Sequence, residues 1–257
     1  SAEEFRSIFG DSDQLRYFSA PGRTEVGGNH TDHNHGKVLA ASVDLDTVAA
    51  AAKRDDGIIV EKSFKFDALE VDISDLEVHT EEFGKSSGLI RGMCAGFKER
   101  GYNIGGFNAA SMSRVLSGSG LSSSAAYEVL IGTILNHLYN DGKVSPVEVA
   151  KIAQYAENKY FGKPCGLLDQ TASSVGSFIT IDFKDPSRPI INKVDFDFAS
   201  CGHALCIIDT GGNHSDLTDD YAAVRGEMEK AAETVLVNSG ANLRADVLQV
   251  GHHGSST

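Results

Sequence analysis

Cysteine is scarce in this sequence, and its spacing does not suggest disulfide bonds. The chain has four cysteines among 257 residues, and no two of them form a C-x-x-C pair. A chain of this length can build a hydrophobic core without covalent cross-links, because disulfide frameworks are typical of much smaller secreted domains. We therefore expect reduced thiols and a cytoplasmic location.

Long hydrophobic runs and basic residues are also in short supply. No apolar run reaches the roughly 20 residues that a membrane-spanning helix needs, and the segment from Ser1 to Glu4 does not resemble a signal peptide. Acidic residues outnumber basic ones by 36 to 23, which gives a formal net charge of −13. This balance argues against nucleic acid or an anionic membrane as the main partner. A protein of this charge that handles phosphates must gather its few cations locally or bind Mg²⁺.

The most informative stretch is a glycine- and serine-rich loop that leads into an apolar run, residues 116–131. Gly118 and Gly120 lie in the loop, and three serines at 122–124 precede residues that predict a helix. The first N–H groups of a helix have no internal partner, and the helix dipole adds partial positive charge there. Glycines let an anion approach the backbone, and serine hydroxyls can cap the helix, bind a phosphate oxygen or ligate Mg²⁺. The stretch predicts a polyphosphate site, with an ordinary capped loop as the alternative. It is neither a Walker A loop nor a G-x-G-x-x-G motif.

Hydrophobic periodicity and turn residues predict an α+β fold. Helices are expected at 3–9, 86–100, from the serines to 139, at 145–160, 167–175 and 217–236. Strands are expected at 15–20, 47–52, 57–64, 69–73, 106–113, 177–183, 189–194 and 204–209, with a short apolar segment at 37–43. The Pro21-Gly22 pair predicts a turn after the first strand. Strands come mainly first and helices cluster later, which favours α+β over a regular βαβ alternation.

A second polar segment is the glycine-rich loop at 24–36. It offers many hydrogen-bond donors and acceptors, as a sugar site needs, because each sugar hydroxyl can both donate and accept. A solvated loop is the plain alternative. His30, His33 and His35 leave a metal site as a further alternative, although zinc-binding histidines usually lie on a helix or beside cysteines.

Two carboxylates stand out in the later part of the chain. Glu157 lies on a predicted helix before the break at Cys165-Gly166, and Asp169 interrupts an otherwise apolar run. Glu157 is either a solvent-facing helix residue or a functional group, and Asp169 is either a charge at a helix N-terminus or a placed catalytic carboxylate.

Taken together, three segments resemble the galactokinases of the GHMP kinase family. APGRTEVGGNHTDHNHGKVLA (residues 20–40) resembles the galactokinase signature, LSGSGLSSSAAYEVL (116–130) the second GHMP motif, and KPCGLLDQ (163–170) the segment with the catalytic aspartate. The resemblance runs from about Phe9 to Glu233. It implies a GHMP-kinase N-terminal domain at 1–198, of the ribosomal-protein-like α+β fold, and the start of a C-terminal domain at 199–257. It also implies ATP- and Mg²⁺-dependent phosphorylation of a sugar at its anomeric hydroxyl, with galactose as the expected sugar.

The resemblance also implies a role for individual residues. Asp169 would be the general base, and Arg23 would lie beside it, lower its pKa and stabilise charge during transfer. The residues expected to line the sugar are Asn29, His30, Asp32, Cys165, Gly166 and Tyr221. Those expected to bind the nucleotide phosphates are Gly118, Ser119, Gly120, Leu121, Ser122, Ser123 and Ser124. Ser124 and Glu157 would bind the metal ion.

The match has departures. Asn29 stands where the family carries a glutamate that contacts the sugar, and Thr24-Glu25 replace the usual Val-Asn. A related hexose or pentose therefore stays open as the substrate, and we expect Asn29→Glu to shift the sugar preference. A catalytically silent sugar-binding or regulatory homologue is a further alternative, and a hydrolase that binds metal through the histidine loop is another.

The end of the chain departs further. No third glycine-rich motif follows, and residues 237–257 do not match the family, so we interpret the chain as truncated or misassembled. The segment around His252-His253 resembles a short piece of a metallo-β-lactamase-type hydrolase, but it is too short to carry that fold. The apolar face of the predicted helix 217–236 would then be available for self-association.

Overall fold

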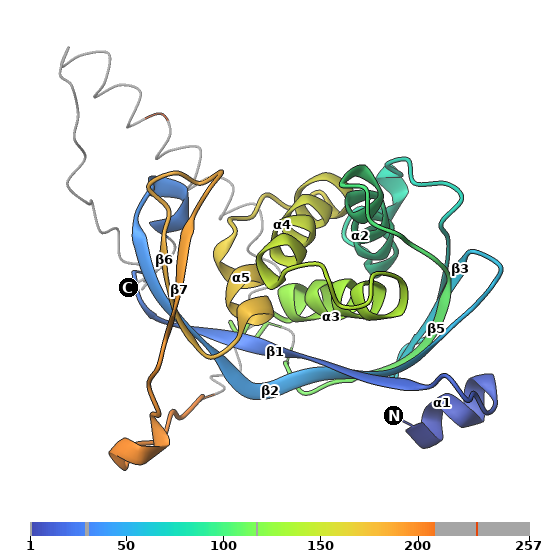
Figure 1. Cartoon of the computed structure of the whole chain (residues 1–257), viewed down its shortest axis with the longest axis horizontal. Coiled ribbons are helices and arrows are strands. Elements are labelled where there is room, and N and C mark those ends of the chain that lie inside the picture. The colour runs from blue at the N-terminus through green and yellow to red at the C-terminus, as the bar shows by residue number, and fades with distance from the viewer. Residues whose placement is uncertain (1, 29–30, 117, 209–229, 231–257) are drawn as a thin grey trace, which may run out of the picture.

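A curved, mixed β-sheet carries a layer of helices on one face (Figure 1). The computed structural model describes residues 2–28, 31–116, 118–208 and Lys230. The strands are β1 (Arg16–Gly27), β2 (Lys37–Lys53), β3 (Ile58–Ser63), β4 (Ala68–Asp72), β5 (Phe107–Ser113), β6 (Phe178–Asp182) and β7 (Ile190–Val194). The helices are α1 (Ala2–Phe9), α2 (Ser86–Glu99), α3 (Ser123–Tyr139), α4 (Pro146–Ala156) and α5 (Leu168–Val175), with short turns η1 (Thr31–Asn34), η2 (Thr80–Glu82), η3 (Glu157–Phe161) and η4 (Ala199–Cys201). The expected α+β fold class is confirmed.

The long strand β2 organises the sheet. The order is β4-β3-β5-β2-β6-β7, and β1 pairs with β2 from its other side. The pairing of β3 with β5 is parallel, and the other pairs are antiparallel. Residues 37–43 and 47–52, expected as separate segments, therefore belong to one strand.

The turn predicted at Pro21-Gly22 is also wrong, because β1 continues through it. The pairing of β1 with β2 instead shifts register between Pro21 and Arg23. Proline cannot donate to a sheet ladder, and it is tolerated on strands with one free side and at bulges. Both conditions are met here: among the described strands β1 pairs with β2 alone, and the register shift lies at the proline.

Alternating alanines in β2 serve both faces of the sheet. Ala49 and Ala51 belong to the main core under the helices, whereas Ala50 and Ala52 pack with Phe5 of α1 on the opposite face. Successive residues of a strand point to opposite faces. These small side chains allow helices to lie close to the sheet on either side.

Helix α4 continues directly into a π-helical turn that begins at Glu157. Ser145 accepts a hydrogen bond from the Glu148 backbone N–H, which confirms the predicted N-cap. After Ala156 the helix widens into the π-helical turn η3 and ends at Gly162, whose φ is 78°. π-helical turns inside helices are frequent at functional sites, and this one begins with Glu157.

Beyond β7, the strand expected at 204–209 is not found in its described part, and the later predictions fall on residues that the structure does not describe. Residues 204–208 form no regular secondary structure, and Leu205, Ile207 and Ile208 are exposed. The predicted buried strand is absent there because no strand among the described residues pairs with this segment. The predicted helix 217–236, apart from Lys230, and residues 237–257 lie outside the described residues.

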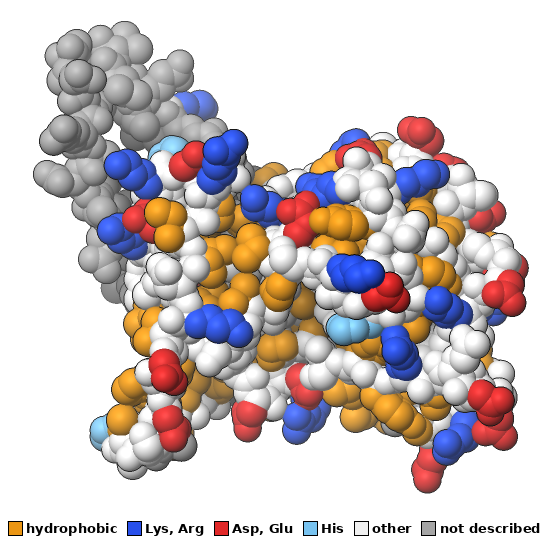
Figure 2. Space-filling model, in the orientation of Figure 1, with side chains coloured by type: hydrophobic (Ala, Val, Ile, Leu, Met, Phe, Trp, Pro, Cys, Tyr) orange, Lys and Arg blue, Asp and Glu red, His pale blue; other side chains and the backbone are white. Residues whose placement is uncertain are grey.

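On the face shown in Figure 2, basic and acidic side chains are interspersed, and the described residues there form no continuous basic area. None of the helices in the described ranges is long and apolar enough to cross a membrane.

Candidate functional site

Asp169 lies in the first turn of α5 between two side chains that come from distant parts of the chain. Arg23 Nε on β1 donates to Asp169 Oδ1 at 2.7 Å. Ser122 Oγ, at the start of α3, donates to Asp169 Oδ2 at 2.5 Å. The glycine-serine loop and the carboxylate singled out in the sequence therefore meet at one site, although they are far apart along the chain.

Hydrogen bonds from Arg23 hold the glycine-serine loop against β1, and the small size of Gly22 allows the contact. Arg23 Nη1 donates to the Gly120 carbonyl at 2.6 Å, and the Arg23 backbone N–H donates to the Leu121 carbonyl at 3.1 Å. A Cβ atom at Gly22 would lie 3.0 Å from the Leu121 oxygen, so glycine permits this close approach. Gly118 and Gly120 both have a φ of 74°, a conformation that glycine adopts without strain.

Ser122 does not cap helix α3 with its side chain, contrary to one use expected for these serines. It occupies the N-cap position with φ 57° and ψ 63° and makes no side-chain cap hydrogen bond. A left-handed conformation is uncommon for a residue other than glycine, and such strain clusters at functional sites. Its hydroxyl turns to Asp169 instead, so no side chain at the N-cap covers the first N–H groups of α3, which helix geometry leaves without internal partners.

Arg23 concentrates positive charge inside an acidic protein. Its side chain is buried, and Nη2 lies 3.3 Å from Glu25 Oε1. Burial alone would lower the pKa of the guanidinium, but the nearby charge and hydrogen bond of Asp169, followed by the charges of Glu25 and Asp32, raise that pKa above its usual value. Arg23 is therefore a fixed cation beside Asp169.

Glu157 is the centre of a second cluster, next to the first. The residue is 3% exposed, and its carboxylate accepts hydrogen bonds from Ser124 Oγ at 3.2 Å and Gln170 Nε2 at 2.7 Å. Lys163 Nζ lies 3.7 Å from Oε1. Burial raises the pKa of Glu157 above its usual value, although Lys163 and the hydrogen bonds oppose this shift.

The Ser124–Glu157 pair fits a magnesium ion by its chemistry. Hydroxyl and carboxylate oxygens are the ligands that Mg²⁺ prefers, and it usually binds one or two protein oxygens together with water and phosphate. The two oxygens are 3.2 Å apart, close to the separation of neighbouring ligands around an ion with bonds of about 2.0–2.1 Å. A bound cation would also favour the ionised form of the buried Glu157.

The alternative metal site in the histidine loop gains no support from the described residues. They contain no group of three His, Cys, Asp or Glu side chains that could hold a metal ion. His35 Nδ1 lies 3.2 Å from the Lys184 carbonyl oxygen. His30 lies outside the described residues.

The residues expected to line a sugar lie near the same site as far as they are described. Asp32 is buried in η1, and a Cβ atom at Gly166 would overlap with its Oδ2. Cys165 Sγ lies 3.4 Å from Gln170 Nε2. Burial, reinforced by nearby carboxylates, raises the pKa of this thiol well above its usual value, so it stays protonated. Asn29, His30 and Tyr221 lie outside the described residues.

Sequence reasoning missed residues that support the site. Glu128 on α3 is fully buried, and Gln170 Nε2 lies 3.4 Å from its Oε2. Burial and then the charge of Glu157 raise the pKa of Glu128 well above its usual value. The available signal was the position of Glu128, a lone charged residue in the apolar run 125–131. A charged residue that is buried with such a run usually has a specific partner. Gln170, directly after Asp169, offered no comparable signal.

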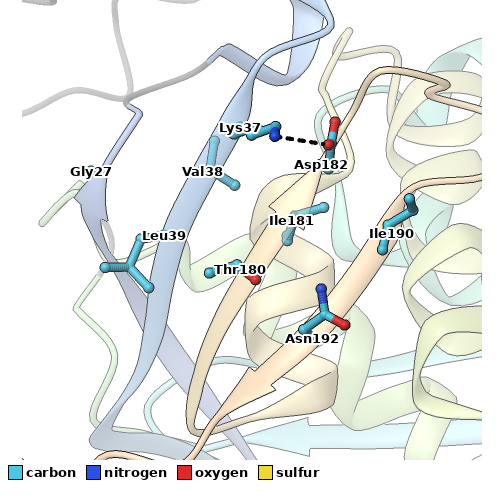
Figure 3. A pocket seen from close by; sticks show the side chains of 9 residues that line it. All are labelled: Gly27, Lys37, Val38, Leu39, Thr180, Ile181, Asp182, Ile190 and Asn192. Atoms are coloured by element: carbon cyan, nitrogen blue, oxygen red, sulfur yellow. Dashed lines mark ion pairs between the residues drawn. The ribbon is translucent and has the colours of Figure 1, made fainter.

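A surface groove elsewhere on the molecule is not this site. It has a volume of about 480 Å³ and lies along β2, β6 and β7 (Figure 3). Its lining residues are Gly27, Lys37, Val38, Leu39, Thr180, Ile181, Asp182, Ile190 and Asn192. None of the candidate residues lines it, so chemistry and hydrogen bonding, not hollow volume, locate the candidate site.

Two family models match this chain. Residues 3–53 match the galactokinase galactose-binding signature, and residues 88–177 match the N-terminal domain of the GHMP kinases. The galactokinase of Streptomyces coelicolor is 34% identical over 242 residues, which are 92% of this chain and 61% of that protein. The galactokinase of Bacillus subtilis is 32% identical over 236 residues, 88% of this chain and 58% of that protein. The chain thus spans about 60% of the length of these relatives.

Solved structures of related kinases have a similar fold. The crystal structure of Lactococcus lactis galactokinase complexed with galactose has a TM-score of 0.76 and 27% identity, and the match covers 95% of this chain and 62% of that one. The mevalonate kinase of Methanococcus jannaschii has a TM-score of 0.60 at 14% identity, over 74% of this chain and 59% of that one. The second likeness concerns the fold alone.

Proposed function

Because the chain belongs to the galactokinase family of GHMP kinases, we propose that it carries part of a catalytic site for ATP-dependent phosphorylation of galactose at the anomeric hydroxyl. The observation that supports this most directly is the Asp169 carboxylate, hydrogen-bonded to both Arg23 and Ser122 at the N-terminus of α3. Residues 1–198 would form the N-terminal domain and 199–257 the start of a second one.

Asp169 would act as the general base. Its side chain is 29% exposed, so a substrate hydroxyl can reach it. The proton of the anomeric hydroxyl would pass to the carboxylate while the sugar oxygen attacks the γ-phosphorus, and ADP would leave. Arg23 would orient the carboxylate and offset negative charge, which is the main demand of phosphoryl transfer.

The N-terminal end of α3 would hold the nucleotide phosphates. Uncapped N–H groups and the helix dipole favour an anion there, and the positive φ of Gly118 and Gly120 shapes the loop that leads to them. In this proposal Ser119, Leu121 and Ser123 complete the loop. Mg²⁺ bound by Ser124 and Glu157 would neutralise charge on the phosphoryl oxygens.

The sugar would lie on the η1 side of Asp169. Asp32 and the Cys165-Gly166 segment would contact it, together with Asn29, His30 and Tyr221. A buried polar group such as Asp32 gives sugar selectivity, because a missing hydroxyl leaves it without a partner.

The proposal is tested by ADP release from MgATP in the presence of galactose, glucose or arabinose, using the whole 257-residue chain. We expect ADP release that requires both Mg²⁺ and a sugar, with galactose preferred. Galactose binding without ADP release would instead identify a sugar-binding protein without turnover. Release that is highest with another sugar would contradict the substrate assignment.

A further inference from the structure

The described part of the molecule has two buried side-chain polar atoms without a hydrogen-bond partner, and they belong to residues in contact with one another. The atoms are Glu128 Oε1 and Gln170 Oε1, and both residues are fully buried. A buried polar atom without a partner is rare and destabilising, because it has lost its hydrogen bonds to water. Such a pair beside a candidate site needs an explanation other than packing.

Gln170 connects these residues to the proposed metal ligands. Its Nε2 donates to Glu157 Oε2 at 2.7 Å and lies 3.4 Å from Glu128 Oε2 and 3.4 Å from Cys165 Sγ. Glu157 in turn accepts the hydrogen bond from Ser124. An amide nitrogen has two hydrogens, and here three acceptors surround it, so each acceptor influences where the amide points.

Glu128 is the acceptor whose role is otherwise unexplained. It makes no ion pair with a lysine or arginine of the described residues, and it lies one helical turn after Ser124 on α3. A carboxyl group in such surroundings is retained at a cost in stability. Its removal would leave the amide of Gln170 free to turn away from Glu157.

We propose that Glu128 is a positioning residue: it orients the Gln170 amide, which holds the Glu157 carboxylate opposite Ser124. This inference rests on the proposed function only in its assignment of a divalent cation to Ser124 and Glu157. Groups that orient metal ligands typically change metal affinity or activity by roughly 10–100-fold when they are removed.

The test compares Glu128→Leu with Glu128→Gln in the full chain. Leucine removes both polar atoms at similar bulk, whereas glutamine can accept from Gln170 Nε2 and donate to Gln170 Oε1. The readout is Mn²⁺ binding in the presence of a non-hydrolysable ATP analogue, followed by electron paramagnetic resonance, with galactose binding measured separately by calorimetry. We expect Glu128→Leu to weaken Mn²⁺ binding by roughly 10–100-fold and leave galactose binding unchanged, and Glu128→Gln to bind Mn²⁺ like the unmodified chain.

Several outcomes would overturn the inference. One is Mn²⁺ binding by Glu128→Leu as tight as in the unmodified chain, and another is an equal loss of Mn²⁺ and galactose binding. If Glu128→Leu does not fold, Gln170→Met tests the same link, and tight Mn²⁺ binding by that variant would overturn it. Absence of Mn²⁺ binding by the unmodified chain would also overturn it. Mn²⁺ and nucleotide binding without sugar-dependent ADP release would contradict only the proposed function.

Discussion

The carboxylate of Asp32 lies against the α-carbon of Gly166, so closely that a methyl group at position 166 would overlap with Oδ2. Asp32 belongs to η1, in the galactokinase signature segment, and Gly166 belongs to the segment that leads to Asp169. This contact joins the two parts of the chain that we propose to bind the sugar.

Gly166→Ala should therefore weaken sugar binding, because the new methyl group displaces Asp32. Overpacking of this kind typically costs about 1–3 kcal/mol, and we expect a higher KM for galactose with a smaller change in the KM for ATP. Gly84→Ala is a suitable control: its φ of +74° strains an alanine, but nothing lies within 4 Å of the added Cβ. If both variants change the galactose KM equally, the contact has no role in sugar binding.

Ser122→Ala should lower kcat more than it raises the KM for galactose. The hydroxyl donates to Asp169 Oδ2 at 2.5 Å, and hydrogen bonds to charged groups contribute about 1.5–3 kcal/mol, which corresponds to roughly 10–150-fold in rate. Ser174→Ala is the matched control, because it removes another hydroxyl of the same region, whose bond goes to the Pro146 carbonyl at 2.7 Å. Equal kcat values for the two variants would contradict the role of Ser122.

A buried carboxyl group in the sheet makes stability depend on pH. Glu61 on β3 is 4% exposed and accepts hydrogen bonds from the hydroxyls of Ser111 and Tyr127. Burial raises the pKa of Glu61 above 4.5, and the two hydrogen bonds only partly oppose it. The folded state thus keeps this proton to a higher pH than the unfolded state does. Its contribution to stability is present below about pH 4.5 and is lost as the pH rises through the folded pKa, by up to about 1.4 kcal/mol per pH unit.

Glu61→Gln should reduce this loss, since glutamine stays neutral. Its amide oxygen can accept one of the two hydrogen bonds, and its amide nitrogen can donate to the other hydroxyl oxygen. The free energy of unfolding, measured in urea between about pH 5 and pH 8, should fall less steeply in the variant than in the unmodified chain. Parallel curves, or a steeper decline in the variant, would show that Glu61 ionises in the folded state as it does in the unfolded one.

Much of the fold followed from local sequence signals, and the failures have identifiable causes. Capping residues and periodicity located the helices, as at Ser145. Residues 37–43 and 47–52 were expected as separate segments, and residues 44–46 between them were not assigned to a strand. Asp46 in fact accepts hydrogen bonds from Ser19 on β1 and from Arg114, which directly follows β5. β2 is paired with β1 on both sides of residues 43–45, so the strand continues through them. Local patterns do not reveal this pairing.

The candidate site was predicted in outline, since its motifs are short and local. The glycine-serine loop, Arg23 and Asp169 were found as separate segments, and the structure brings them together. The supporting role of Gln170 and Glu128 could not be predicted, because it depends on contacts between α3, η3 and α5. Similarly, the sequence does not reveal that the Ser122 hydroxyl donates to Asp169 instead of capping α3. That choice goes with the left-handed backbone conformation of Ser122, which the structure shows.

The most direct test of the proposed function is Asp169→Asn, with galactose-dependent ADP release and galactose affinity measured on the same preparation. Asparagine keeps the size of the side chain but cannot take the proton, and general base catalysis contributes roughly 10²–10⁴-fold. We expect Asp169→Asn to lose ADP release by that factor and to retain its galactose affinity. ADP release close to that of the unmodified chain would contradict it.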